Sequence, residues 1–418
     1  MAGSAWRHVL SRVVLVGALG YFVDIYDLLI YNIVRTPSLA ALGVAPGQVR
    51  GTGEYLLLWQ MGGLLVGGIA WGVLGDRRGR RSVLFGSIAL YSLANLANAA
   101  VQTVPQYAAV RLLAGLGLAG ELGAAVTLVS EALPKDLRGY GTMVVSALGI
   151  LGAALGFLVA RLDWRVAYLT GGGLGLLLLA ARLSLRESAM FQSLSATAGR
   201  RGDLLLFLGS RGAAGFSWFR GNGDRLRRLG KVALVGVPLW CAIGVLITFS
   251  NDVGRGLHLR GAVAPATSVL VSYVGASLGS LGSGALSQVL RSRRLALLAF
   301  IDFTAVVAGL FLLIDGTTDT MFYTLAFLLG FGVGYWAVFV QTAAEQFGTD
   351  LRATVATAAP NLVRGSILVV VPLFHVLAPR LGVPGAAILL LAATLSLALG
   401  AAWRLPETYG RECSTRCT

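Results

Sequence analysis

The sequence is short of charged residues, histidines and cysteines. Only 13% of its 418 residues are charged and 56% are hydrophobic, whereas soluble proteins carry roughly 25% charged residues. A soluble fold of this length would lack the polar surface that water requires. Disorder is excluded as well, because it needs low hydrophobicity. The composition therefore predicts a protein that lies in a membrane.

The scarcity of reactive side chains argues against several kinds of site. Three cysteines are too few for a disulfide framework, and the sequence has neither a metal-ligand cluster nor a nucleophile constellation. The pattern G-x-G-x-x-G at Gly115, Gly117 and Gly120 lies inside an apolar stretch. Small residues there permit close helix packing, whereas a dinucleotide site requires a strand-to-helix turn. We expect no enzyme activity, no metal and no cofactor.

Long apolar runs are abundant. A helix needs about 20 apolar residues to cross a hydrocarbon core of roughly 30 Å. Twelve such runs are present: 13–33, 54–74, 82–101, 107–130, 140–161, 165–184, 231–250, 265–290, 294–314, 319–343, 354–379 and 382–404. We predict an N-terminal six-helix bundle (1–184), a cytoplasmic central loop (185–230) and a C-terminal six-helix bundle (231–418).

The positive charge indicates the orientation. Lysines and arginines number 34 against 19 acids, for a net charge of +15, and most lie between the runs on the side that holds both termini. The other side has only Arg35, Arg50, Arg161, Arg165, Arg255, Arg260 and Arg380. This bias places both termini in the cytoplasm. It also explains the basic excess without nucleic-acid binding.

The two halves carry an internal repeat. The motif E-x-x-x-x-D-L-R ends the fourth run (Glu131 to Arg138) and returns 214 residues later at the end of the tenth (Glu345 to Arg352). The same offset relates Gly120 to Gly334. Six runs per half is an even number, so the halves insert in the same sense and are related by a pseudo-twofold axis along the membrane normal.

Several motifs resemble those of the major facilitator superfamily, nearest its metabolite:proton symporter and sugar-porter branches. They are Gly72-x-x-x-Asp76-Arg77-Arg78-Gly79-Arg80-Arg81, Arg111-Leu-Leu-Ala-Gly115-Leu-Gly117, Arg186-Glu187-Ser188, Leu405-Pro406-Glu407-Thr408 and Asp24-Ile-Tyr26-Asp27. The resemblance covers essentially the whole chain and implies transport by alternating access. Gln288 stands where the second half would carry an acid, and Leu325 stands where the repeat would echo Arg111.

Buried ionisable groups are the candidate coupling residues, because a charge in hydrocarbon needs a partner or a function. A rise of 1.5 Å per residue places Asp27 at the depth of Arg111, and Asp24 at the depth of Glu121. We therefore predict an Asp27–Arg111 pair, with Asp24 and Glu121 facing a central cavity. In the resembling symporters the matching acid–arginine pair couples protons to conformation. The alternative is a static ion pair between two helices.

Arg364 is the other arginine inside a run, and its depth suggests no acidic partner. Arginine recognises carboxylate and phosphate groups well, so we expect it to bind an anionic substrate group. The alternative is a structural role, such as capping carbonyls or pairing with Glu345. We expect the same cavity to be lined by Asn361, Gln341, Trp336 and Gln60, although each of these is also an ordinary packing residue.

The loops on the inner side carry the candidate gate. Charge pairs that form in only one conformation bias the equilibrium between conformations. The candidate gating residues are Asp76, Arg77, Gly79, Arg80, Arg81, Glu131, Arg138, Glu345 and Arg352.

The sequence thus predicts a secondary active transporter for a small organic solute, possibly anionic, that works as a proton-coupled symporter. The alternatives are a proton-driven exporter or antiporter, a uniporter, a transporter-like receptor or scaffold without transport, and an integral membrane enzyme. The expected partners are the solute, protons and the lipid bilayer. We expect a monomer in a bacterial inner membrane.

Overall fold

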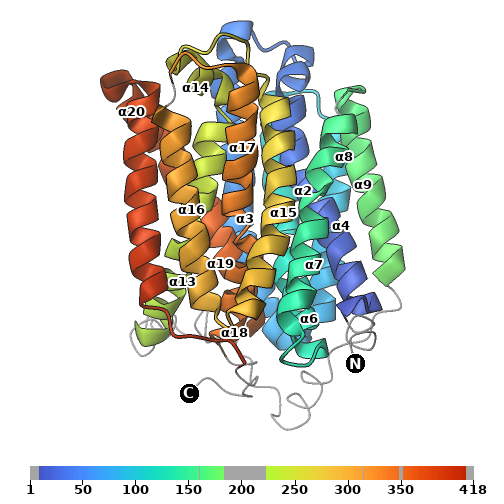
Figure 1. Ribbon diagram of the computed structural model, residues 1–418. Helices are drawn as coiled ribbons and strands as arrows, with labels where there is room; N and C mark the ends of the chain where they lie inside the picture. The colour runs from blue at the N-terminus through green and yellow to red at the C-terminus, as the bar shows by residue number, and fades with distance from the viewer. Residues whose placement is uncertain (1–8, 160, 183–222, 314, 348–351, 411–418) are drawn as a thin grey trace.

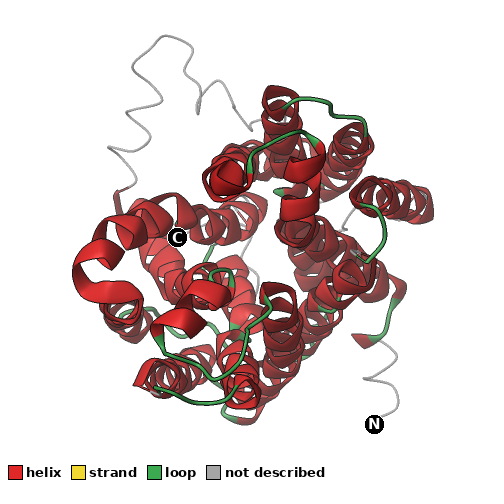
Figure 2. Ribbon diagram, turned by 90° about the horizontal axis from the view of Figure 1, so that it is seen from above, coloured by secondary structure: helices red, strands yellow, loops and turns green. Residues whose placement is uncertain are grey.

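The computed structural model describes residues 9–159, 161–182, 223–313, 315–347 and 352–410. Within these ranges the chain is helical, without strands (Figure 2). Most of the predicted central loop, 183–222, lies outside the described residues, as do the side chains of Asp76, Arg77 and Arg80.

The first six membrane crossings are built from eight helices, because the fourth and fifth crossings are interrupted. The helices are α2 (Arg12–Ala41), α3 (Val49–Arg78), α4 (Arg80–Ala99), α5 (Val104–Leu118), α6 (Glu121–Ala132), α7 (Arg138–Ile150), α8 (Gly152–Val159) and α9 (Trp164–Ala181). A 3-10 turn, η1 (Pro46–Gln48), leads into α3. Gly79 joins α3 to α4 with φ 94° and ψ 158°, a conformation that is essentially restricted to glycine.

The second six crossings follow the same plan with more interruptions. They are built from α13 (Gly223–Cys241) with the π-helical turn η3 (Ala242–Ile247), α15 (Pro265–Val289), α16 (Arg293–Leu313), α17 (Asp319–Val333) with α18 (Trp336–Glu345), α19 (Arg352–Gly365) and α20 (Ile367–Trp403). A short helix, α14 (Ser250–Gly256), follows η3. The backbone leaves the helical conformation at Gly382, so α20 contains parts of two crossings.

These helices confirm the predicted fold class. Eleven described stretches are long and apolar enough to cross a membrane, and the last of them, 352–403, holds the two crossings on either side of Gly382. Large apolar side chains such as Leu93, Leu177 and Leu313 are exposed on the outside. Charged side chains within the crossings, such as Asp24, Asp27 and Arg364, are in contrast buried inside. This distribution is the one that a lipid environment requires.

The molecule has an inner and an outer end. The inner end is the one at which α2 begins and α20 finishes, and the outer end is the one that carries η1 and α14 (Figure 1). Both bundles contribute helices to each end. The boundaries of the predicted domains remain a proposal, since most of the central loop is not described.

Candidate functional site

The membrane-crossing part of the molecule contains a layer of buried charge. It consists of three acids and three arginines, none of them more than 1% exposed: Asp24, Asp27, Glu121, Arg111, Arg182 and Arg364. The acids lie on α2 and α6, and the arginines on α5, after α9 and on α19. All six belong to the first bundle except Arg364. The layer carries no net formal charge when every group is ionised.

One ion pair in this layer joins the two bundles. Arg364 Nη2 of α19 lies 3.1 Å from Asp24 Oδ2 of α2 and donates a hydrogen bond to it. The indole of Trp336 lies 5.9 Å from the guanidinium carbon of Arg364, and Tyr21 is within electrostatic range. The expectation that Arg364 has no acidic partner was therefore wrong. Equal depth had paired Asp24 with Glu121, but the partner comes from the opposite bundle.

A second ion pair lies entirely within the first bundle. Both Nη atoms of Arg182 donate to the carboxylate of Glu121, with Nη1 at 2.8 Å from Oε2. A Cβ at Gly20 would lie 1.9 Å from both partners, so glycine makes room for the pair on α2. Glu121 is thus held by Arg182, and it does not face an open cavity.

Asp27 and Arg111 do not form the predicted ion pair in this conformation. Among the described residues, neither the carboxylate oxygens of Asp27 nor the guanidinium nitrogens of Arg111 have a hydrogen-bond partner. The guanidinium of Arg111 instead lies 4.8 Å from the ring of Tyr31 and 5.8 Å from that of Tyr168. The two charges remain within electrostatic range. Their proposed role in coupling stays a prediction.

Asp27 sits in a tight place against α9. A Cβ at Gly171 would lie 2.1 Å from Asp27 Oδ1. Asn95 of α4 is also close enough to interact with the carboxyl group. Only glycine therefore fits at position 171 beside this carboxylate.

A small cavity lies directly outward of the Asp24–Arg364 pair. Its volume is about 20 Å³, which holds about one water molecule. Ile367, three residues beyond Arg364, and Leu29, five residues beyond Asp24, line it, together with Asn32, Leu57, Met61, Trp240, Ile243, Gly244, Thr248, Val269, Tyr273 and Val371. The residues come from both bundles. The cavity therefore marks a space between the bundles that is nearly closed in this conformation.

The predicted lining residues lie elsewhere. Gln341 is at the inner end, where it accepts a hydrogen bond from Thr142 and donates one to Glu345. Asn361 Nδ2 donates to Ala119 O at 2.8 Å across the bundle interface. Gln60 is fully buried, and its amide has no hydrogen-bond partner among the described residues. Trp336 does lie beside the predicted substrate-binding arginine.

The two bundles are in close contact near the inner end. A Cβ at Gly72 would lie 2.6 Å from Thr354 Cα, and one at Gly123 would lie 2.4 Å from Thr357 Cα. Midway along α15, Ser277 Oγ donates to Ala147 O of α7 at 2.8 Å. Small residues let the backbones approach this closely. The inner end is therefore shut.

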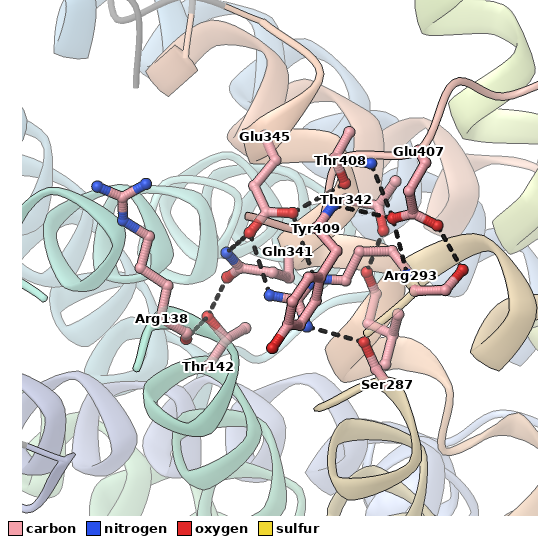
Figure 3. A network of polar contacts seen from close by, with 12 residues as sticks. Arg138, Thr142, Ser287, Arg293, Gln341, Thr342, Glu345, Glu407, Thr408 and Tyr409 are labelled. Atoms are coloured by element: carbon pink, nitrogen blue, oxygen red, sulfur yellow. Dashed lines mark hydrogen bonds and ion pairs between the residues drawn. The ribbon is translucent and has the colours of Figure 1, made fainter. Parts of the chain in front are cut away.

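A polar network lies at this inner end (Figure 3). Glu345 accepts hydrogen bonds from Arg293 Nε at 3.3 Å, from Gln341 Nε2 at 2.5 Å and from Thr408 Oγ1 at 2.8 Å. Through Gln341 the network reaches Thr142 of the first bundle. Glu345 thus pairs with Arg293, and the suggested pairing of Arg364 with Glu345 was wrong.

Glu407 caps the start of α16 in the same network. Its carboxylate accepts from Ser292 Oγ and from the backbone N–H of Arg293 at 2.9 Å and Arg294 at 3.2 Å. Burial acts to raise the pKa of Glu407, but these hydrogen bonds to the ionised form outweigh it and lower the pKa below its ordinary value. The residues that follow α20 are thereby fixed to α16.

The repeated acidic motif pairs across the bundles. Arg352 Nη1 lies 3.5 Å from Glu131 Oε1, so the arginine of the second copy meets the glutamate of the first. Arg138 of the first copy donates to Leu133 O at 3.2 Å within its own turn. Arg81 lies over the ring of Phe85. The gating roles of these residues, and of Asp76, Arg77, Gly79 and Arg80, remain a proposal.

The outer end has a charged cluster that the sequence analysis did not predict. Arg50 lies 3.2 Å from Glu54 on its own helix and 3.3 Å from Asp252 of α14. Glu54 Oε2 in turn lies 3.1 Å from His375 Nε2 of α20. Arg50 also covers the ring of Phe249 at 5.5 Å. We call these residues the outer cluster, and they link the bundles one helical turn outward of the cavity.

The sequence does contain a signal for the buried Arg182. It lies within the predicted run 165–184 and so met the criterion applied to Arg111 and Arg364. The outer cluster has a weaker signal, since Arg50, Glu54 and His375 lie at the ends of runs. Only the fold brings them together.

Twelve crossings in two bundles, with a buried ion pair between them, define a polytopic α-helical membrane protein that has a polar interior site. The Major Facilitator Superfamily model matches residues 17–372. The chain belongs to this superfamily.

Individual relatives cover the chain to different extents. The chain is 36% identical over 166 residues to the 3-(3-hydroxy-phenyl)propionate transporter of Escherichia coli, a match that spans 37% of this chain and 41% of the relative. It is 25% identical over 405 residues to the "Probable 4-methylmuconolactone transporter" of Cupriavidus pinatubonensis, covering 94% of this chain and 89% of the relative. The first of these matches spans less than half of the relative.

Solved structures have the same fold. The proton:xylose symporter XylE of E. coli, bound to 6-bromo-6-deoxy-D-glucose, superposes with a TM-score of 0.74. The superposition covers 96% of this chain and 97% of XylE at 16% identity. At this identity the likeness concerns the fold alone.

Proposed function

We propose that this protein is a proton-coupled symporter of small organic carboxylates that works by alternating access. The observation that carries the proposal is the buried Asp24–Arg364 pair, which joins the two bundles beside a cavity lined from both of them. A site between two bundles is reached from either side when the bundles rock. Buried carboxylates are the groups that can carry protons across such a site.

The expected substrate is an aromatic carboxylate. Arg364 supplies the cation for a carboxylate group, and Trp336, Trp240 and Tyr273 supply aromatic surface beside it and along the cavity. The name of the E. coli relative specifies a phenyl-substituted propionate. The acids of α2, Asp24 and Asp27, are the proposed proton carriers. Arg111 and Glu121 set the charge around them.

The topology and assembly follow from the same proposal. The inner end faces the cytoplasm, in accordance with the positive-inside rule, and the membrane is a bacterial inner membrane. The protein works as a monomer because each chain contains both bundles. The inner network and the Glu131–Arg352 pair act as the gate on the cytoplasmic side.

Uptake by proteoliposomes tests the proposal. With acid outside, wild-type protein should accumulate radiolabelled benzoate or 3-(3-hydroxyphenyl)propionate, and an uncoupler should abolish the accumulation. Arg364→Gln should weaken binding at least tenfold, since a hydrogen bond to a charged group contributes about 1.5–3 kcal/mol. Arg227→Gln, on an exposed part of α13, is the matched control and should behave as wild type.

Other outcomes would change the assignment. Downhill flux without accumulation would indicate a uniporter, and accumulation driven only by acid inside would indicate an exporter. Unchanged affinity in Arg364→Gln would remove this arginine from the binding site.

A further inference from the structure

We infer that an anionic phospholipid binds at the inner end of the second bundle, on the surface that faces the membrane. Its phosphate group lies on Arg291, Arg294 and Arg404, and its acyl chains lie along α16 and α20. This site is separate from the buried layer of charge in the membrane-crossing part. The inference is independent of the proposed function, because it concerns what the folded protein binds in its membrane.

The start of α16 and the end of α20 meet at this site. The two helices pack against each other, and both reach the inner end (Figure 1). The guanidinium carbon of Arg294, on the first turn of α16, lies 5.9 Å from the centre of the ring of Trp403, the last residue of α20. Arg291 lies in the turn that leads into α16, and Arg404 directly follows Trp403. We call these four residues the inner basic patch.

The three arginines of the inner basic patch lack counter-ions from the protein. Within the described ranges, none of them forms an ion pair. Arg291 and Arg404 are exposed and Arg294 is partly buried, whereas Arg293 between them is buried against Glu345. A guanidinium presents planar N–H donors that match the oxygens of a phosphate group. The patch therefore offers donors to an anion that the protein does not itself supply.

Glu407 is the acid beside the patch, and its carboxylate is already occupied. It accepts hydrogen bonds from the backbone N–H groups of Arg293 at 2.9 Å and Arg294 at 3.2 Å. It also accepts from the backbone N–H groups of the two residues that follow it, both at 2.8 Å. These bonds cover the N-terminus of α16, so the anion site consists of guanidinium groups and not of the helix end. Three arginines and one carboxylate leave two positive charges in excess.

The backbone of Arg291 indicates a role for its side chain. Its φ is 50°, in the left-handed region that glycine and asparagine adopt most easily. The turn is closed by hydrogen bonds from Arg291 N to Gln288 O at 3.3 Å and from Ser292 N to Ser287 O at 3.2 Å. Backbone strain is often retained at binding sites. Here an arginine is retained where the turn alone would favour glycine.

The apolar side chains around the patch favour a lipid over a water-soluble anion. Trp403 is 69% exposed, and Leu290 and Leu295, which flank the arginines of the turn in the sequence, are 42% and 48% exposed. Tryptophan is enriched where the hydrocarbon meets the headgroups. A phospholipid places its phosphate on the arginines and its chains on this apolar surface. Free phosphate would leave the apolar surface unused.

The charge of the patch decides between kinds of phospholipid. Its excess of positive charge attracts a headgroup with a net negative charge, such as that of phosphatidylglycerol. Phosphatidylcholine has the same phosphate, but the patch repels its choline cation. Basic pockets between helices on the cytoplasmic side of a membrane protein bind anionic headgroups for this reason. The positive-inside rule assigns the inner end to that side.

Lipid binding to the purified full-length protein in mild detergent tests the inference. The probe is dioleoylphosphatidylglycerol, and dioleoylphosphatidylcholine, with the same chains, is its control. Native mass spectrometry should show one phosphatidylglycerol bound about tenfold or more tightly than phosphatidylcholine, since each arginine near the surface adds to the attraction. Phosphatidylglycerol should also raise the midpoint of thermal unfolding, because it binds the folded state. Glycerol 1-phosphate, the headgroup without chains, should not.

Substitutions then locate the site. The triple variant Arg291→Gln, Arg294→Gln, Arg404→Gln should bind the two lipids with nearly equal affinity. Its matched control removes the same charge from exposed positions elsewhere at the inner end and should keep the wild-type preference: Arg12→Gln, Lys135→Gln, Arg227→Gln. If the first triple variant does not fold, Arg404→Gln alone should lower the preference about threefold or more.

Arg291→Gly separates lipid binding from a structural role. Glycine relieves the backbone at this φ, so the midpoint in detergent alone should rise. The further rise caused by phosphatidylglycerol should be smaller than in wild type, because one guanidinium is gone. The two changes therefore have opposite signs, whereas an arginine that only stabilised the turn would lower the midpoint in detergent when replaced.

Several results would overturn the inference. They are equal binding of the two lipids by wild type, a wild-type preference that persists in the triple arginine variant, and a preference that is lost equally in the control variant. A stabilisation by glycerol 1-phosphate as large as that by phosphatidylglycerol would also overturn it, because the site would then bind a free anion. None of these outcomes bears on transport, which the proteoliposome experiments test separately.

Discussion

The two bundles meet differently at the inner and the outer end of the molecule. At the inner end, glycines of the first bundle lie against the backbone of α19, and the side chains of Arg293 and Glu345 are only 3% and 9% exposed. At the outer end, the contact is made by the outer cluster, in which the side chains of Arg50, Asp252 and His375 are 51%, 30% and 32% exposed.

The difference indicates which end opens more readily. A backbone contact through glycines cannot loosen gradually, because protein interiors are close-packed and leave little free volume. Exposed ion pairs contribute only about 0–1 kcal/mol each and weaken with salt. We therefore expect this inner-closed conformation to open outward at little cost, while opening inward has to separate a packed interface.

The largest effect is expected from a methyl group in the inner interface. Gly123→Ala would place a Cβ 2.4 Å from Thr357 Cα, so the bundles must separate at this end. Uptake should fall more than tenfold. Spin labels at Lys135 and Arg291 would report on loops at the inner end of the two bundles. The distance between them should increase in double electron–electron resonance measurements.

The control for this variant is another glycine in a helix. Gly173→Ala of α9 meets nothing within 4 Å and should leave transport and the label distance unchanged. An unchanged distance in Gly123→Ala would show that the inner contact is more compliant than its geometry indicates.

A smaller but clear effect is expected from the inner ion pair. Arg293→Gln removes the cation from Glu345, whose side chain is only 9% exposed. Removing one partner of a buried pair costs about 3–5 kcal/mol. The midpoint of thermal unfolding in detergent should fall by several degrees. A shift of less than one degree would mean that water replaces the arginine, and the network would then not hold the inner end.

The smallest effect is expected from the same substitution at the outer end. Arg50→Gln removes contacts to Glu54 and Asp252 at a side chain that is half exposed, where a pair contributes at most about 1 kcal/mol. The midpoint of thermal unfolding should hardly change. Any difference in midpoint between wild type and Arg50→Gln should disappear in high salt. A loss as large as that of Arg293→Gln would remove the contrast between the two ends.

Much of the fold was predictable because membranes impose strict rules on sequence. The number of apolar runs, the repeat at Glu131 and Glu345 and the placement of arginines all follow from the cost of exposing backbone or charge to lipid. Breaks such as the one between α5 and α6 were not predicted. Apolar composition is the same on both sides of such a break.

The candidate site was predicted only in part. Rise per residue gives the depth of a side chain but not its direction around the helix axis. Depth therefore suggested Asp27–Arg111, whereas Asp24 faces Arg364 across the bundles and Arg111 lies between aromatic rings. Gln341 was also expected to line the cavity, but its hydrogen bonds place it in the inner network.

The scarcity of charge and the pattern of apolar runs determined by themselves that this chain crosses a membrane twelve times as two related halves. They also singled out most of the buried charges, because each such charge stands out against an apolar background. Which acid meets which arginine was decided by the tertiary structure alone. Pairing depends on the rotation of each helix and on the contact between bundles, and both are set by packing among residues far apart in the sequence.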